Sequence, residues 1–70
     1  MKKIDKYLIS ENDSIRNSIK KMDIEHVEFL AVYNSKEKIV GVFTMGDFRR
    51  YVLRGLDINE KILKIVNKKF

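Results

Sequence analysis

The stretch Ile39–Arg50, IVGVFTMGDFRR, constrains the fold most, because a short apolar run passes directly into a glycine, an aspartate and two arginines. Its first five residues have the length and the partly β-branched composition of a buried strand. The pair Gly46-Asp47 suits a helix start, where a carboxylate complements the unpaired N–H groups of the first turn. The sequence therefore predicts a buried strand with a tight entry into a helix.

Polar groups at this junction match the chemistry of a ribose phosphate. Unpaired amides at a helix start favour an anion, the Thr44 hydroxyl donates or accepts, and the Asp47 carboxylate accepts hydrogen bonds from two vicinal hydroxyls. The alternative is structural, with Asp47 capping the helix and Thr44 ending the strand. Arg49 and Arg50 either pair with phosphates or are solvated. Successive helix residues point about 100° apart, so we expect at most one arginine, preferably Arg50, to face a ligand.

Composition limits the remaining chemistry. Seventy residues make one small domain that buries only about 60% of its unfolded surface, so we expect it to need a partner surface. There is no cysteine for a disulfide or a thiolate metal site, and the single histidine, His26, has no obvious co-ligands. We expect no resident metal or cofactor.

No nucleophile and base occur in a recognisable context, and there is no complete P-loop, so no enzymatic activity is expected.

The net charge of +5 comes mostly from lysines spread along the chain. Because a nucleic-acid site shows positive charge gathered on one face, nucleic acid is not an expected partner. No apolar run is long enough for a membrane span, and residues 1–5 lack the apolar region of a signal peptide. These features predict a cytoplasmic protein.

Apolar patterns before the junction predict a strand, a helix and a second strand. Tyr7–Ile9 is a short apolar stretch, and from Ser14 onward apolar residues recur at helical spacing as far as Met22, which we expect to fill the core. Phe29–Tyr33 is an unbroken apolar run that suits a strand covered on both faces. The turn-like segment Asn34–Lys38 predicts antiparallel pairing with the next strand, whereas the first strand should join in parallel by a crossover.

After the junction the pattern predicts two helices. The first covers Asp47–Arg54, places Phe48, Tyr51 and Val52 on its inner face and ends before a left-handed Gly55. The second begins with a reciprocal cap between Asp57 and Glu60 and continues with the apolar residues Ile58, Ile62, Leu63, Ile65 and Val66. Its end, Val66–Phe70, has the same order of apolar, polar, basic and aromatic residues as Ile4–Tyr7. This similarity indicates either the start of a second copy of the unit or two unrelated basic helix ends.

The predicted order of strand, helix, strand, strand and helix resembles that of a CBS domain from Tyr7 to about Leu53. Gly41, Thr44 and Asp47 add the spacing G-x-x-T-x-x-D to this resemblance. The resemblance implies an α+β fold, a CBS-type β-α-β-β-α unit with a small three-stranded mixed sheet and helices on one side, plus a C-terminal linker helix. We expect one CBS repeat over residues 1–56 and the linker helix over 57–70, leading toward a second repeat.

The string Phe43–Arg50 looks closest to CBS repeats attached to bacterial sugar-1-phosphate nucleotidyltransferases, with sugar-phosphate isomerases second. The resemblance implies a regulatory module that pairs with a second CBS repeat, in trans as a homodimer, and senses AMP, ADP or ATP to modulate an attached enzyme. Carried over by position, Thr44 meets the ribose-phosphate region and Asp47 the ribose hydroxyls, with Arg50 as the third ligand-binding residue.

Two departures from the family pattern support an alternative. Leu8 stands where many members have a polar residue that faces the phosphate, and Ala31 stands where they have a proline. The alternative function is a ligand-free module that dimerises the parent enzyme.

Overall fold

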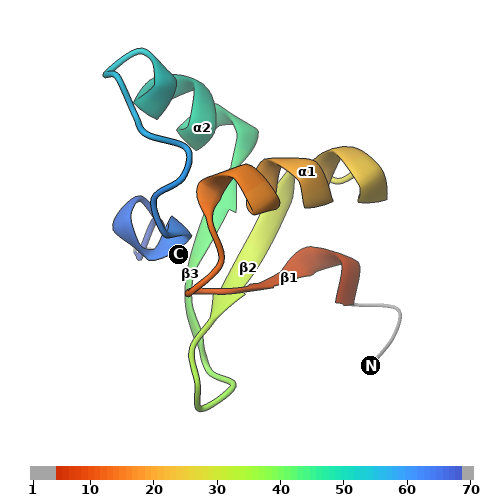
Figure 1. The fold of residues 1–70 in the computed structure, drawn as a ribbon. Coiled ribbons are helices and arrows are strands. Elements are labelled where there is room, and N and C mark those ends of the chain that lie inside the picture. Colours follow the sequence, from red (N-terminus) through yellow and green to blue (C-terminus); the bar gives the residue numbers. More distant parts are fainter. Residues whose placement is uncertain (1–4, 69–70) are drawn as a thin grey trace.

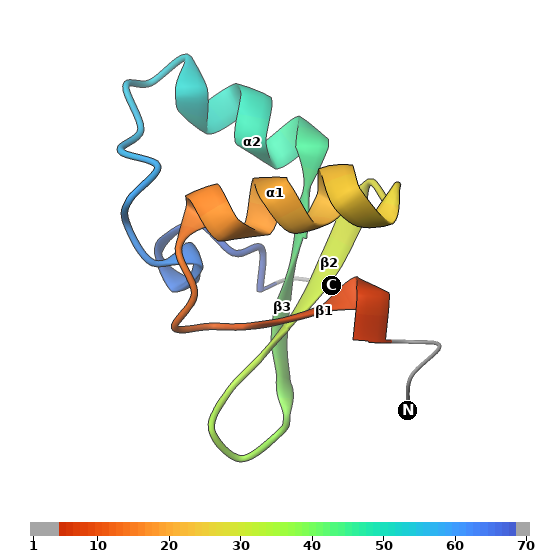
Figure 2. The same ribbon diagram turned by 45° about the vertical axis from the view of Figure 1, so that its right-hand side comes forward.

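The computed structural model describes residues 5–68, which follow the predicted order of strand, helix, strand, strand, helix. The elements are the 3-10 turn η1 (Asp5–Tyr7), strand β1 (Leu8–Ser10), helix α1 (Ile15–Glu25), strands β2 (Phe29–Tyr33) and β3 (Ile39–Thr44), helix α2 (Met45–Val52) and the 3-10 turn η2 (Ile62–Lys64). Both helices lie on one side of the sheet, as Figure 1 and Figure 2 show. Ile4, Lys69 and Phe70, which the suggested internal repeat needs, lie outside the described residues.

The three strands form one mixed sheet in the order β1, β2, β3. β1 runs parallel to β2, and β2 runs antiparallel to β3, so both predicted pairings are confirmed. The hairpin loop is held by the Asn34 side-chain oxygen, which accepts hydrogen bonds from the N–H groups of Lys36 at 2.9 Å and Lys38 at 3.0 Å. A short polar loop of this kind fixes the hairpin register.

Helix α1 has a defined side-chain cap at its start and a left-handed residue at its end. The Ser14 hydroxyl accepts a hydrogen bond from the Asn17 N–H at 3.0 Å, which caps the first turn. Ser18 is fully buried and donates its hydroxyl to the Ser14 carbonyl at 3.0 Å, which satisfies its polar group within the core. His26 has φ 59° and donates its N–H to the Met22 carbonyl, so it terminates the helix.

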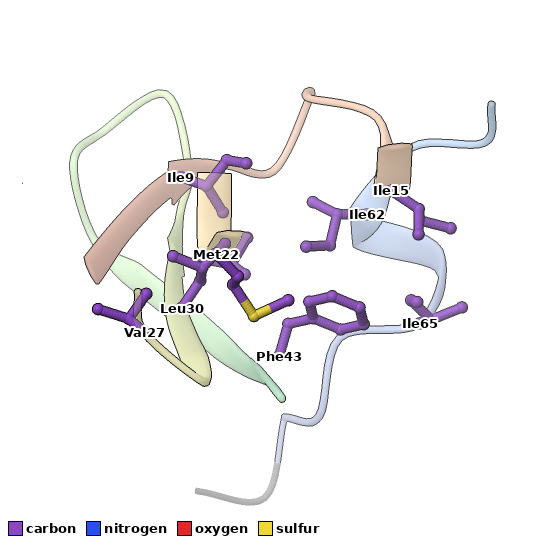
Figure 3. Packing of buried hydrophobic residues seen from close by; sticks show 9 residues of the cluster. Ile9, Ile15, Met22, Val27, Leu30, Phe43, Ile62 and Ile65 are labelled. Carbon is purple, nitrogen blue, oxygen red and sulfur yellow. The ribbon is translucent and has the colours of Figure 1, made fainter. Parts of the chain in front are cut away.

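The core lies between the sheet and the two helices and is centred on Phe43, which is fully buried. Figure 3 shows its ring between the side chains of Met22 and Ile65, with Ile62 nearby. The predicted core role of Met22 is confirmed, because only 2% of this residue is exposed. Nine apolar residues form the buried cluster: Ile9, Ile15, Met22, Val27, Leu30, Val32, Phe43, Ile62 and Ile65.

The prediction that β2 is covered on both faces is wrong. Leu30 and Val32 are fully buried beneath the helices, but Phe29 is 43% exposed and Ala31 is only partly buried. The reason is that both helices pack on the same side of the sheet. We call the side turned away from the helices the open face.

Helix α2 begins two residues earlier than predicted, because Thr44 rather than a later residue is its N-cap. Phe48 and Tyr51 pack against the core, which confirms their predicted structural role. Val52 was predicted on the inner face and is instead 45% exposed, because the helix ends there and the chain turns away. Gly55 has φ 81°, in agreement with the predicted left-handed position.

The predicted C-terminal linker helix is wrong, because residues 57–68 form the 3-10 turn η2 together with turns and two isolated bridges, and no α-helix. The Asp57 carboxylate accepts a hydrogen bond from the Asn59 N–H at 2.9 Å and caps a turn instead of a helix. We call residues 57–68 the C-terminal strap. Figure 1 shows it beside β3 and the start of α1.

Backbone hydrogen bonds to distant parts of the chain explain why the strap is not helical. The Ile15 N–H donates to the Glu60 carbonyl at 2.9 Å, and the Arg16 N–H donates to the Ile58 carbonyl at 2.8 Å. These are N–H groups of the first turn of α1, which have no partner inside their own helix. The strap therefore uses its carbonyl groups to complete α1 rather than to form a helix of its own.

The end of the strap pairs with β3. Val42 and Asn67 exchange two backbone hydrogen bonds, each of 2.9 Å, in an antiparallel bridge. Between this bridge and α1, Ile62 and Ile65 enter the core with 0% and 6% of their surface exposed. The boundary predicted at residue 56 stays a prediction, and substitution of Ile62 tests it, as described in the Discussion.

Candidate functional site

The junction of β3 and α2 has no intervening loop. Thr44 ends β3 in an extended conformation, with φ −123° and ψ 164°, and is at the same time the N-cap of α2. Its hydroxyl accepts a hydrogen bond from the Asp47 N–H at 3.1 Å, and the Asp47 Oδ2 accepts one from the Thr44 N–H at 3.1 Å. This reciprocal capping box satisfies two backbone donors at the helix start.

The Asp47 carboxylate also binds Arg50, one helical turn later. Arg50 Nη1 lies 3.1 Å from Asp47 Oδ1, and the Arg50 side chain is 61% exposed whereas that of Asp47 is 12% exposed. Each carboxylate oxygen therefore has one protein donor. The capping interpretation of Asp47 is confirmed, and ribose binding stays a prediction, because a carboxylate oxygen has a second lone pair for another donor.

Thr44 lies at one end of the open face. It is the register partner of Phe29, whose ring stacks on Tyr7 with a centroid distance of 5.0 Å. Leu8, Ala31 and Val42 follow as register partners across β1, β2 and β3 on the same side of the sheet. The structure thus joins the polar Thr44-Asp47 junction to a partly apolar surface.

The aromatic pair of Tyr7 and Phe29 was not identified from the sequence as part of the site. Tyr7 lies in η1, just before β1, and Phe29 begins β2, so they are 22 positions apart in the chain. Apolar runs in the sequence indicate strands without showing which residues share the open face. Only the β1 to β2 register brings these two rings together beside Thr44.

The two other arginines that follow Asp47, one in α2 and one just after it, do not contact its carboxylate. Arg49 is exposed on the helix surface, and the Arg54 guanidinium lies over the Tyr51 ring at 5.7 Å from its centroid. Of these three arginines, the structure brings Arg50 to the Thr44-Asp47 junction. His26 lies elsewhere, at the end of α1.

A cavity of about 560 Å³ lies on the helix side of the sheet. It is lined by eight residues of α1, α2 and the segment that leads to β2: Ile19, Lys20, Met22, Asp23, His26, Val27, Glu28 and Met45. None of the predicted site residues Thr44, Asp47 and Arg50 lines it. Within residues 5–68 there is no group of three acidic or histidine side chains suited to a metal ion.

No helix within residues 5–68 has the length and apolar character needed to cross a membrane.

Capping by Thr44 is expected to contribute about 1 kcal/mol to stability. In a Thr44→Val variant the side-chain shape is kept, but the Asp47 N–H loses its acceptor, so the free energy of unfolding should fall by about 0.5–2 kcal/mol. Thr44→Ser keeps the hydroxyl and is the matched control. Urea unfolding followed by circular dichroism measures both, and equal losses for the two variants would contradict the capping role.

The mixed three-stranded sheet with two helices on one side (Figure 1), and a capped strand-to-helix junction at its end, define a small α+β domain. The family model for the CBS domain matches residues 2–54, and the chain belongs to this family. A comparison with curated proteins gave no match.

Solved structures share the fold. An uncharacterised conserved protein from Pyrococcus horikoshii superposes with a TM-score of 0.83 at 25% identity, over 90% of this chain and 48% of its own. A CBS-domain protein from Pyrobaculum aerophilum, solved in complex with AMP, has a TM-score of 0.81 at 21% identity, over 87% and 48%. The CBS domains of a transcriptional regulator from Streptococcus pneumoniae have a TM-score of 0.75 at 20% identity, over 96% and 53%. The chain therefore spans about half the length of these relatives.

Proposed function

We propose that this chain is a regulatory CBS module that pairs with a second CBS repeat and binds an adenosine nucleotide, AMP, ADP or ATP, at Thr44, Asp47 and Arg50. The observation that carries the proposal is the meeting of the Thr44-Asp47 junction with the open face of the sheet. The junction offers polar groups to a ribose phosphate, and the open face offers apolar surface to a base. The AMP complex of the relative from Pyrobaculum aerophilum supports this choice of ligand.

A second CBS repeat is the proposed partner, supplied in trans by another copy of the chain. The three structures described above are about twice as long as their aligned regions, which is consistent with repeats that occur in pairs. Phe29 and Ile39, both more than 40% exposed, give the sheet apolar surface that a second copy would bury. We propose a homodimer on this basis, located in the cytoplasm as the sequence predicts.

Regulation of an attached enzyme completes the proposal. A nucleotide shifts the balance between two arrangements of the pair only if it binds one of them more tightly, and a tenfold shift needs about 1.4 kcal/mol of difference. The string from Phe43 to Arg50 is the sequence feature that favours a sugar-phosphate nucleotidyltransferase as the attached enzyme. The module itself is proposed to have no catalytic activity.

Isothermal titration with AMP, ADP and ATP tests the binding site. We expect saturable binding of at least one nucleotide, weakened about tenfold or more in Asp47→Ala, because a hydrogen bond to a charged group is lost. Asp57→Ala removes the same charge from an exposed turn and is the matched control. Circular dichroism at the titration temperature verifies that each variant is folded. If Asp47→Ala binds as tightly as the parent chain, Asp47 is not part of the site.

A second candidate function is a ligand-free module that dimerises the parent enzyme. It is favoured by the engagement of both Asp47 oxygens within the protein and by the apolar neighbours Leu8 and Ala31 on the open face. Both candidates require a dimer in analytical ultracentrifugation, but only nucleotide binding raises the melting temperature when nucleotide is added. A dimer with an unchanged melting temperature would favour assembly alone.

A further inference from the structure

Arg50 controls the charge beside the buried carboxylate of the junction. Asp47 is only 8% exposed, and its Oδ1 lies 3.1 Å from Arg50 Nη1. A phosphate that approached an isolated carboxylate in so sheltered a place would meet strong repulsion, because the interaction between like charges grows as the effective dielectric falls. The positive charge of the Arg50 guanidinium offsets the negative charge of the Asp47 carboxylate through their ion pair.

The same guanidinium has donors left for a ligand. Arginine carries five N–H donors in a planar fork, and the Asp47 contact uses one of them. Among residues 5–68 the remaining donors of Arg50 have no hydrogen-bond partner, and 61% of the side chain is exposed. Asp47 therefore orients a group that suits a phosphate and remains accessible from solvent.

The neighbouring arginines are placed differently. Arg49 is exposed and points about 100° away around the helix axis. The Arg54 guanidinium lies over the Tyr51 ring. Of these three cations, Arg50 is the one that contacts the carboxylate expected to bind a ribose.

Resting on the proposed function, we propose that Arg50 is the residue that makes this site select a nucleoside monophosphate over the corresponding nucleoside. Paired with Asp47, it removes the repulsion between that carboxylate and the phosphate, and it offers its remaining N–H groups to the phosphate oxygens. Asp47 accepts the sugar hydroxyls with its remaining lone pairs. The phosphate preference therefore resides in Arg50, and sugar recognition resides in Asp47.

Isothermal titration of the full chain with AMP and with adenosine tests this assignment. For Arg50→Met we expect AMP to bind about tenfold or more weakly, since hydrogen bonds from a charged donor are lost. The affinity for adenosine should change by less than about twofold, as expected for removal of an exposed charge. Arg49→Met removes the same charge one residue away and should leave both affinities unchanged. Thermal unfolding of each variant verifies that it is folded at the titration temperature.

The outcomes separate this inference from the function on which it rests. Equal loss of AMP affinity in Arg50→Met and Arg49→Met would assign the preference to overall charge and overturn the role of Arg50. Equal loss of AMP and adenosine affinity in Arg50→Met would reduce Arg50 to a residue that positions Asp47, which also overturns it. If the parent chain binds AMP but the ratio of the AMP affinity to the adenosine affinity is the same in Arg50→Met as in the parent chain, only this inference fails. If the parent chain binds neither compound, this inference fails, and the proposed function fails with it only when ADP and ATP do not bind either.

Discussion

Replacing Ile62 with alanine is expected to lower the free energy of unfolding by about 2–5 kcal/mol, the range for truncation of a buried isoleucine. Ile62 is fully buried beside Phe43, although it belongs to the strap that follows the predicted end of the repeat. A domain of this length has a total stability of roughly 4–10 kcal/mol, so the loss is a large fraction of the whole. Urea unfolding followed by circular dichroism measures it.

Leu63→Ala is the matched control, because Leu63 is the next residue in the same 3-10 turn and is 36% exposed. We expect it to cost clearly less than Ile62→Ala, about 1 kcal/mol, since Leu63 is already partly exposed and does not belong to the buried cluster or to the residues packed against it. A large loss for Ile62→Ala alone would show that the strap is part of the folded unit and place the boundary beyond residue 56. Equal small losses would mean that the strap is dispensable, as the predicted boundary requires.

Replacing Gly41 with alanine is expected to destabilise the domain by about 1–3 kcal/mol, the usual cost of overpacking. A Cβ atom at Gly41 would lie 2.5 Å from Val66 Cγ2 and 2.7 Å from the Asn67 backbone oxygen. The Val66 side chain has freedom to rotate, but the Asn67 oxygen is held by the Val42 N–H at 2.9 Å. The end of the strap must therefore move away from β3.

Gly46→Ala is the matched control, with the opposite expected sign. The nearest atom to its Cβ would be Thr44 Oγ1 at 3.6 Å, an ordinary contact, and Gly46 lies in the first turn of α2. Alanine there should be neutral or stabilising by up to about 1 kcal/mol, because it restricts the unfolded chain and favours the helix. Urea unfolding gives both values.

Hydrogen exchange locates the effect of Gly41→Ala. The Val42 and Asn67 amides should exchange faster in this variant, because they bond to each other across the bridge. The Asp47 amide, which bonds to Thr44 within the capping box, should keep its protection. Unchanged exchange at Val42 and Asn67 would contradict the close approach of the strap to β3.

The structure explains why a glycine occupies position 41. In the sequence Gly41 is the first position of the G-x-x-T-x-x-D spacing, and no role could be assigned to it. In the structure it is the point where Val66 and Asn67 come closest to β3. The need for glycine there depends on residues 25 and 26 positions later in the chain, so no local pattern reveals it.

The sequence was sufficient where the determining interactions are local. Thr44 and Asp47 are three residues apart and satisfy each other's backbone groups, so a helix start near them follows from local interactions, although the sequence pattern placed it at Asp47 instead of Met45. The hairpin between β2 and β3 is likewise set by a five-residue loop and the apolar runs that flank it. The spacing alone did not decide between a cap and a ligand-binding group at Asp47, since both use the same carboxylate.

Amphipathic spacing after residue 56 predicted a helix, but tertiary structure decided otherwise. The carbonyl groups of Ile58 and Glu60 accept hydrogen bonds from the first N–H groups of α1, and Ile62 enters the core from a 3-10 turn. Helix propensity is worth only tenths of a kcal/mol per residue, and contacts with the rest of the domain exceed it.

The sequence by itself determined the order of strands and helices and the role of Asp47 at a helix start, because short apolar periods and adjacent residues encode them, and its resemblance to CBS domains indicated the type of unit. Only the tertiary structure decided which face of the sheet stays open and where the strap lies (Figure 1). The physical reason is that these features depend on packing directions and on hydrogen bonds between residues far apart in the chain, which local spacing does not specify.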